Sequence, residues 1–242
     1  MSESRFRLLL VTPIVGDEFN AVAERYVREM PLPPDVTVSC ASLDRGPVSI
    51  ETMFDEAHAA PAAIEEVLRL FRSDYDAVIV NCCADPGVHA LREVLDVPVV
   101  GAGEASYYTA ALLAPSFSVI SVLRNSVPHT RMRIRTLGLE SRLASVYGID
   151  AGVLDLKGAG IKDAILTAAV RAVEEDGADC IVLGCTGMAD VAGEVRKGLR
   201  VPVVEPTAAA IWQAMSLARQ GLRHGRAWMY LPADPSKLSR RP

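Results

Sequence analysis

One pattern occurs twice in the chain, and it limits the fold more than any other feature of the sequence. The segment Asp76–Cys82, a short aliphatic run followed by a cysteine, is echoed by Asp179–Cys185, 103 residues later. Each cysteine is followed by a second shared segment, Val-Pro-Val-Val, at Val97–Val100 and again at Val201–Val204, 104 residues later. This nearly constant offset predicts an internal duplication, with two similar lobes of roughly 100 residues each.

Short aliphatic runs alternate with amphipathic segments along the rest of the chain. Strands that are aliphatic throughout and separated by helices are typical of a parallel sheet covered on both faces. We therefore expect an α/β fold with two pseudo-symmetric lobes, each a mostly parallel sheet flanked by helices. The predicted strands are Arg7–Val11, Val36–Ala41, Ala77–Asn81, Val97–Val100, Ser118–Leu123, Ala144–Tyr147, Cys180–Gly184 and Val201–Val204, and the predicted helices are Phe19–Met30, Ala60–Phe71, Ile161–Glu175, Ala189–Leu199 and Thr207–Arg219.

The predicted duplication also divides the chain into domains. Residues 1–103 together with residues 205–230 are expected to form the first lobe, and residues 104–204 the second lobe. The helix at Thr207–Arg219 has no strand after it, so it should pack back on the first lobe. Residues 231–242 lack apolar periodicity, which predicts a loose C-terminal tail.

Composition excludes several classes of partner. The 25 Lys and Arg against 30 Asp and Glu give a net charge of −5, which disfavours nucleic acid and anionic membranes. No apolar run approaches the ~18 residues of a membrane span, and the first residues do not read as a signal peptide. Five cysteines without an export signal indicate reduced thiols and a cytoplasmic protein. We expect a small-molecule substrate as ligand and a homo-oligomer, with no nucleic-acid or membrane partner.

The two repeated cysteines are candidates for acid/base chemistry. Cys82 and Cys185 follow predicted strands, and ligands of parallel sheets bind beyond the carboxyl ends of strands. A helix should begin soon after each, with Asp85 as the N-cap after Cys82. A helix N-terminus lowers a thiol pKa, so both positions predict stabilised thiolates. Lobes that face each other would place one thiol on each side of a ligand, which is what inversion of a carbon acid needs: one sulfur removes a proton and the other returns one.

Other uses of the cysteines and histidines fit the sequence less well. A cysteine can simply fill a core, and this is our interpretation of Cys40 and Cys180, which lie within predicted strands. No Cys-x-x-Cys is present, the four histidines are scattered, and no dinucleotide, phosphate-loop or His-Glu-x-x-His motif occurs. We therefore expect neither a metal nor a cofactor. A hydrolytic Cys–His pair stays open, although no spacing favours it.

Three short segments carry a family resemblance. They are Cys82–Gly87, Leu183–Met188 and Gly46–Glu51, the last followed by Asp55-Glu56. Together they resemble the aspartate/glutamate/hydantoin racemase superfamily, and most closely its hydantoin racemase branch, from Leu8 to about Leu222. The resemblance implies a cofactor-independent two-base racemase of two α/β lobes, with Cys82 and Cys185 as the catalytic cysteines.

The chain departs from that family pattern around the expected substrate pocket. The first strand commonly ends in Asn-Pro-Asn in the family and here continues into Thr12-Pro13-Ile14. The residue after the first cysteine is often aromatic in hydantoin racemases and is here Cys83, and the second-lobe strand, often ending in Thr-Thr, ends in Ser121-Val122. The reaction type is therefore better supported than the substrate. The expected substrate-binding residues are Thr12, Pro13, Ile14, Ile50, Cys83, Ser121, Thr186 and Gly187.

The leading functional hypothesis is racemisation or epimerisation at the acidic carbon of a 5-substituted hydantoin or of a related ring such as allantoin. The alternatives are a decarboxylase or desulfhydrase of the same superfamily, an aspartate or glutamate racemase, and a non-catalytic binding protein of the periplasmic-receptor type. A decarboxylase needs only one proton donor, so the presence of both Cys82 and Cys185 disfavours it. The receptor leaves both thiols unexplained and would need an export signal.

Overall fold

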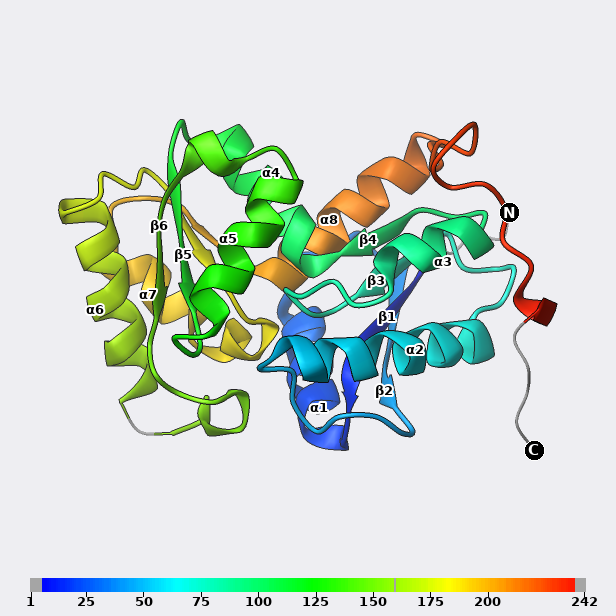
Figure 1. Ribbon diagram of the computed structural model, residues 1–242, viewed down its shortest axis with the longest axis horizontal. Coiled ribbons are helices and arrows are strands. Elements are labelled where there is room, and N and C mark those ends of the chain that lie inside the picture. The colour runs from blue at the N-terminus through cyan, green and yellow to red at the C-terminus, as the bar shows by residue number, and fades with distance from the viewer. Residues whose placement is uncertain (1–5, 159, 238–242) are drawn as a thin grey trace.

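Two parallel β-sheets form the two lobes of the protein, which lie side by side along its long axis (Figure 1). The computed structural model describes residues 6–158 and 160–237. Within these residues the first sheet has the order β2-β1-β3-β4 and the second has the order β6-β5-β7-β8, which is the same topology twice. The strands are β1 (Phe6–Val15), β2 (Val36–Leu43), β3 (Ala77–Val80), β4 (Val99–Gly101), β5 (Phe117–Ser121), β6 (Leu143–Gly148), β7 (Ile181–Leu183) and β8 (Val203–Val204). The predicted α/β fold of two similar lobes is confirmed.

Helices connect the strands and flank the sheets. The α-helices are α1 (Asp17–Glu29), α2 (Met53–Leu70), α3 (Val88–Val94), α4 (Ala102–Leu113), α5 (Ser126–Thr136), α6 (Ile161–Glu174), α7 (Ala192–Gly198) and α8 (Pro206–Arg219). Short 3₁₀ helices are η1 (Glu140–Arg142), η2 (Val153–Asp155), η3 (Thr186–Val191) and η4 (Pro235–Lys237). Among the described residues, no helix is long and apolar enough to cross a membrane.

The central strand β1 shows why the strands are aliphatic without alternation. Leu8 and Leu10 pack into a core on one face of the sheet, whereas Leu9 and Val11 pack into a separate core on the other face. All four side chains are buried, because helices cover both faces. The equivalent strand of the second lobe, β5, is buried along its whole length.

The prediction of strands was better than that of helices. Every predicted strand is present, and the helix expected after Cys82 is α3, but α4 and α5 were not predicted. The predicted start of α2 at Ala60 was wrong, because the helix begins at Met53 behind a capping box formed by Thr52 and Asp55. Helix α4 is buried on several sides, so its sequence lacks the polar stripe that reveals a surface helix.

One apolar core joins the two lobes. It contains Leu8 and Ile79 of the first sheet, Phe117 and Val182 of the second, and Ile211 of α8. Helix α8 packs against β1, β3 and β4, and it also packs along α4. The shared core fixes the position of one sheet relative to the other, and therefore the spacing of everything at their facing edges.

The domain limits drawn from the repeat remain a prediction. The expected boundary between residues 103 and 104 falls inside α4, which contacts strands of both sheets. In the tail that was predicted to be loose, the amide of Ala233 donates to the carbonyl of Glu93, and residues 238–242 lie outside the described part of the chain.

Candidate active site

The two repeated strand ends bring Cys82 and Cys185 to the same place between the lobes. Each cysteine lies two residues beyond its strand, β3 or β7. Both line two adjoining cavities of about 70 Å³ and about 40 Å³, which also share Ile50, Val153 and Thr186. The internal duplication therefore produces the convergence that the sequence predicted.

The loops that carry the two cysteines are hydrogen-bonded to each other. The hydroxyl of Thr186, next to Cys185, donates to the carbonyl of Asn81 at 3.2 Å. In the reverse direction, Cys83 Sγ donates to the carbonyl of Leu183 at 3.9 Å. These two bonds set the distance between the strand ends across the boundary of the lobes.

Asn81 is held on its side chain as well. Its Nδ2 donates to Thr12 Oγ1 at 3.3 Å, and its Oδ1 accepts from Thr207 Oγ1 at 3.0 Å. These partners lie on β1 and at the start of α8, so three segments that are distant in sequence meet directly before Cys82. All three side chains are buried, which makes each bond costly to lose.

All the predicted substrate-binding residues line one or both of the two cavities. The larger one is lined by Ile50, Cys83, Ser121 and Thr186. The smaller one is lined by Thr12, Pro13, Ile14, Ile50, Thr186 and Gly187. The structure thus brings the predicted set together with the thiols, and the role of each residue in binding stays a prediction.

Helix α5 adds cavity residues that the sequence did not reveal. Its first turns contribute Ser126, His129, Thr130 and Arg133 to the cavity lining. The signal was available, because α5 follows the carboxyl end of β5 and such helices begin at the ligand edge of a sheet. Arg133 forms an ion pair with Glu56 of α2, so the guanidinium is held between the lobes.

The loop before α2 belongs to the first lobe and is hydrogen-bonded to the second lobe beside the cavities. The carboxylate of Glu51 accepts the amide of Val153 at 2.7 Å. The carbonyl of Glu51 accepts from Asn125 Nδ2 at 2.9 Å. Glu51, Thr52 and Val153 all line the larger of these two cavities, and none of them is among the predicted site residues, although Glu51 ends one of the segments that carry the family resemblance.

The electrostatics of the two thiols differ from the expectation. Both keep a partly exposed surface, yet burial raises the pKa of Cys82 to about 12 and that of Cys185 to about 11. One backbone amide opposes this shift at each sulfur: Ala84 N donates to Cys82 Sγ at 3.5 Å, and Gly187 N donates to Cys185 Sγ. The predicted lowered pKa values of the two thiols are therefore wrong.

The cause is that neither cysteine begins a long helix. Helix α3 starts at Val88 behind Gly87, so the prediction of Asp85 as its N-cap was also wrong. Cys185 precedes only the short 3₁₀ helix η3. Without a helix dipole directed at the sulfurs, the loss of hydration dominates, and both thiols are neutral near pH 7.

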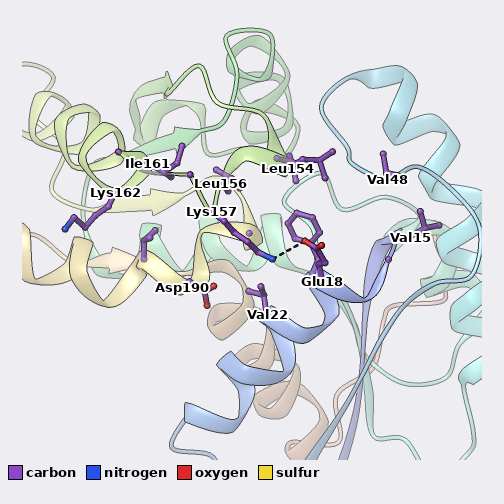
Figure 2. A pocket seen from close by; sticks show the side chains of 17 residues that line it. Val15, Glu18, Val22, Val48, Leu154, Leu156, Lys157, Ile161, Lys162 and Asp190 are labelled. Atoms are coloured by element: carbon purple, nitrogen blue, oxygen red, sulfur yellow. Dashed lines mark hydrogen bonds and ion pairs between the residues drawn. The ribbon is translucent and has the colours of Figure 1, made fainter.

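A much larger cavity of about 650 Å³ adjoins the smaller cavity and shares Phe19, Val153 and Gly187 with it. Figure 2 shows apolar side chains from both lobes along its walls, and Lys157 of the second lobe reaching Glu18 of α1, with Nζ and Oε2 3.2 Å apart. Its apolar lining comprises Val15, Phe19, Val22, Val48, Val153, Leu154, Leu156, Ile161 and Val191.

Gly187 lies at the junction of the large cavity with the thiols. A Cβ at this position would be 2.9 Å from Leu156 Cδ1, 3.3 Å from Phe19 Cε1 and 3.5 Å from Cys185 Sγ. The missing side chain therefore leaves the space between Leu156, Phe19 and the sulfur of Cys185 unfilled. Within residues 6–158 and 160–237, no group of three or more His, Cys, Asp or Glu could hold a metal ion.

Comparisons with known proteins point to one family. The sequence profile of the Asp/Glu/hydantoin racemase family matches residues 8–214. A hydantoin racemase of Paenarthrobacter aurescens is 39% identical over 80% of this chain and 83% of its own length, and one of Pseudomonas sp. (strain NS671) is 37% identical over 81% and 80%. The solved structure of allantoin racemase from Klebsiella pneumoniae superimposes with a TM-score of 0.91 at 30% identity, covering 97% of this chain and 96% of that one.

Proposed function

The chain belongs to the Asp/Glu/hydantoin racemase family, and we propose that it racemises hydantoin-type rings by a cofactor-independent mechanism in which Cys82 and Cys185 are the two acid/base residues. One observation supports the mechanism most: thiols from equivalent strand ends of the two lobes line the same pair of cavities. A ring carbon between them would have one sulfur on each face.

The proposed reaction moves one proton off the ring and another onto it. The thiolate of one cysteine removes the proton from the ring carbon, and the electron pair moves into the neighbouring carbonyl to give an enolate. The neutral thiol of the other cysteine then donates its proton to the opposite face of that carbon. The ring has been inverted, and the thiol and the thiolate have exchanged places.

The charges at the site suit both halves of this reaction. Burial keeps a thiol neutral, which is the form that donates a proton. The amides of Ala84 and Gly187 favour the thiolate form, and the charge of Arg133 acts in the same direction at Cys82. Arg133 would also stabilise the negative charge of the enolate, because it is already held beside the cavity by Glu56.

The large cavity favours rings that carry an apolar 5-substituent. Most of its lining side chains are aliphatic or aromatic, beside the charged Glu18, Lys157, Lys162 and Asp190, and it shares Gly187 with the smaller cavity that the thiols line. Ile14 adds a further apolar side chain in the smaller cavity. We propose that hydantoins with aliphatic or aromatic 5-substituents react faster than allantoin, whose polar ureido group gains little from such a lining.

Incubation in deuterium oxide tests this function. Single enantiomers of 5-benzylhydantoin, 5-isobutylhydantoin, allantoin, aspartate and glutamate would be followed by polarimetry and by NMR of the α-proton. The proposal requires inversion with deuterium incorporation for the hydantoins. Inversion of aspartate or glutamate alone would favour an amino-acid racemase, and a separate incubation with an arylmalonate that released carbon dioxide would favour a decarboxylase.

We expect kcat/KM for inversion to rise with pH between about 7 and about 10. Both thiol pKa values are raised from 9.0, to about 12 and about 11, so the fraction of enzyme with one ionised thiol grows over this range. A raised thiol pKa stabilises the fold below about pH 9 and loses this contribution as the pH rises through the folded value. Circular dichroism at each pH is therefore the control, and a plateau from pH 7 upward would contradict the expectation.

A methyl group at Gly187 should narrow the passage to the large cavity. We expect Gly187→Ala to lower kcat/KM for 5-benzylhydantoin by about tenfold or more, and that for 5-methylhydantoin much less, because the methyl group meets Leu156 and Phe19. Gly193→Ala in α7 is the matched control, since a Cβ there has no atom within 4 Å. Equal losses for both substrates would show that the large cavity does not hold the substituent.

We further propose that the enzyme acts in the cytoplasm as a homo-oligomer. The acidic composition and the free cysteines support the first part. Exposed apolar side chains at Trp228 and Met229 support the second. Light scattering after size exclusion should give a mass that is a multiple of 26.0 kDa, and a mass of 26.0 kDa itself would refute the oligomer.

A further inference from the structure

The carboxylate of Asp85 joins the loop of Cys82 to helix α4, which begins seventeen residues after Asp85. Its Oδ1 accepts the amide of Gly103 at 2.8 Å, and its Oδ2 accepts the amide of Glu104 at 2.7 Å. These amides belong to the first turn of α4, whose N-cap Gly101 has no side chain of its own. Asp85 therefore caps α4 from another loop.

Two glycines leave the space for this contact. A Cβ on Gly101 would lie 2.2 Å from Asp85 Oδ1, and a Cβ on Gly103 would lie 2.4 Å from the carbonyl oxygen of Cys83 and 2.7 Å from Asp85 Oδ2. Asp85 itself has φ 53°, in the left-handed region that residues other than glycine rarely adopt. The carboxylate bonds offset the cost of that conformation.

The same turn holds Cys82. The amide of Asp85 donates to the carbonyl of Cys82 at 3.0 Å, and the amide of Ala84 donates to Cys82 Sγ. The orientation of the thiol thus depends on a four-residue turn whose far end is fixed to α4 by one carboxylate. Glu104, which supplies one of the amides, is in turn held by an ion pair with Arg92.

The second lobe lacks this connection. At the equivalent helix α8, the N-cap Glu205 accepts the amides of Thr207 at 3.0 Å and Ala208 at 2.7 Å, so the helix is capped by its own residue. The loop of Cys185 contributes no carboxylate to it. The two lobes therefore satisfy the equivalent pair of amides in different ways, and within residues 6–158 and 160–237 only the Cys82 loop is attached to the next helix in this manner.

We propose that Asp85 is a positioning residue for Cys82 alone: it holds that thiol at its face of the substrate ring and has no such role for Cys185. The proposal rests on the two-thiol mechanism proposed above. Replacing Asp85 should therefore slow the proton transfers that Cys82 makes at one face of the ring and leave those of Cys185 at the other face unchanged.

Asp85→Asn is the first test. Asparagine keeps the size but offers one acceptor oxygen to two amides, so it leaves one N–H facing an NH₂ group. Inversion of both enantiomers of 5-benzylhydantoin should fall on the order of 10–100-fold, since both directions use Cys82. In deuterium oxide, exchange without inversion should persist for the enantiomer whose proton Cys185 removes, and should fall with inversion for the other.

Gly101→Ala is the second test, and it changes no charge. Its methyl group would clash with Oδ1 of Asp85 and displace the carboxylate from the amides of α4. We therefore expect the same pattern as in Asp85→Asn, with exchange retained only for the enantiomer whose proton Cys185 removes. Glu66→Gln is the matched control for Asp85→Asn, because it also replaces a buried carboxylate by an amide. Glu66 lies in α2, pairs with Arg69 and lines neither of the two cavities around the thiols. This control should leave the ratio of exchange to inversion unchanged for both enantiomers.

The outcomes separate this proposal from the one it rests on. Equal loss of exchange for both enantiomers in the two variants, or no loss in either, would overturn the role of Asp85 while leaving the racemase intact. Failure of the unsubstituted enzyme to invert any hydantoin would overturn the proposed function, and the role of Asp85 with it. Expression of soluble, folded Gly101→Ala keeps the test decisive if Asp85→Asn does not fold.

Discussion

Replacing Cys82 by alanine should lower the rate of hydantoin inversion by ~10²–10⁴-fold, and replacing Cys185 should do the same. Each variant retains one sulfur, which can still remove and return a proton on its own face. Exchange of the α-proton for deuterium should therefore persist for one enantiomer in Cys82→Ala and for the opposite enantiomer in Cys185→Ala. NMR of the α-proton together with polarimetry measures both quantities in the same sample.

Cys83→Ala is the matched control for these variants. Cys83 lies beside Cys82 in the same cavity wall, but its thiol donates to the carbonyl of Leu183. We expect inversion to continue in this variant, with a changed preference among 5-substituents. If either Cys82→Ala or Cys185→Ala kept full inversion, that thiol would not be an acid/base partner, and the two-thiol mechanism would be refuted.

Removing the ring of Phe117 should cost about 3–5 kcal/mol of the free energy of unfolding. Phe117 is fully buried at the start of β5 and stacks on Tyr107 of α4, with the ring centroids 6.3 Å apart. Both side chains belong to the core that joins the two lobes. The cavity left by Phe117→Ala would therefore loosen the packing of both lobes at once. Urea unfolding followed by circular dichroism measures the change.

Leu112→Ala provides the comparison for that measurement. Leu112 lies on the same helix as Tyr107 but is 86% exposed, so its replacement should change the unfolding free energy by no more than about 0.5 kcal/mol. A cost below about 1 kcal/mol for Phe117→Ala would mean that the shared core contributes little to stability. Two separated urea transitions would mean that the lobes unfold independently.

The repeated motif accounts for most of what the sequence could predict. Because Cys82 and Cys185 end equivalent strands, their convergence follows from the topology of parallel sheets, and Thr186 and Gly187 follow from their position beside Cys185. The strands were predicted from the same property, since residues buried on both faces are aliphatic throughout. Ile50 entered through the family resemblance and indeed lines both cavities.

What the sequence could not predict depends on contacts between distant loops. The cap of Asp85 on α4 requires that two separate turns meet, and the local pattern Asp-Pro-Gly pointed instead to the helix directly after it. The raised thiol pKa values arise from desolvation where the two lobes meet, and the sequence alone does not show how deeply a residue is buried there. Arg133 escaped notice because its helix carries no clear apolar stripe.

The return of α8 to the first sheet has a consequence for the synthesis of the chain on the ribosome. Asn81, directly before Cys82, has its side-chain oxygen satisfied by the hydroxyl of Thr207, and the first sheet receives its cover from the helix around that residue. When the N-terminal half emerges, α8 has not yet been synthesised. Part of the core of the first sheet is then uncovered, and the side-chain oxygen of Asn81 lacks the hydroxyl of Thr207. It cannot finish folding until the second half has been translated, so the order of synthesis and the order of assembly differ. The part of the site around Cys82 therefore forms late in folding. It depends on contacts between residues more than a hundred positions apart in the sequence, and such contacts slow folding.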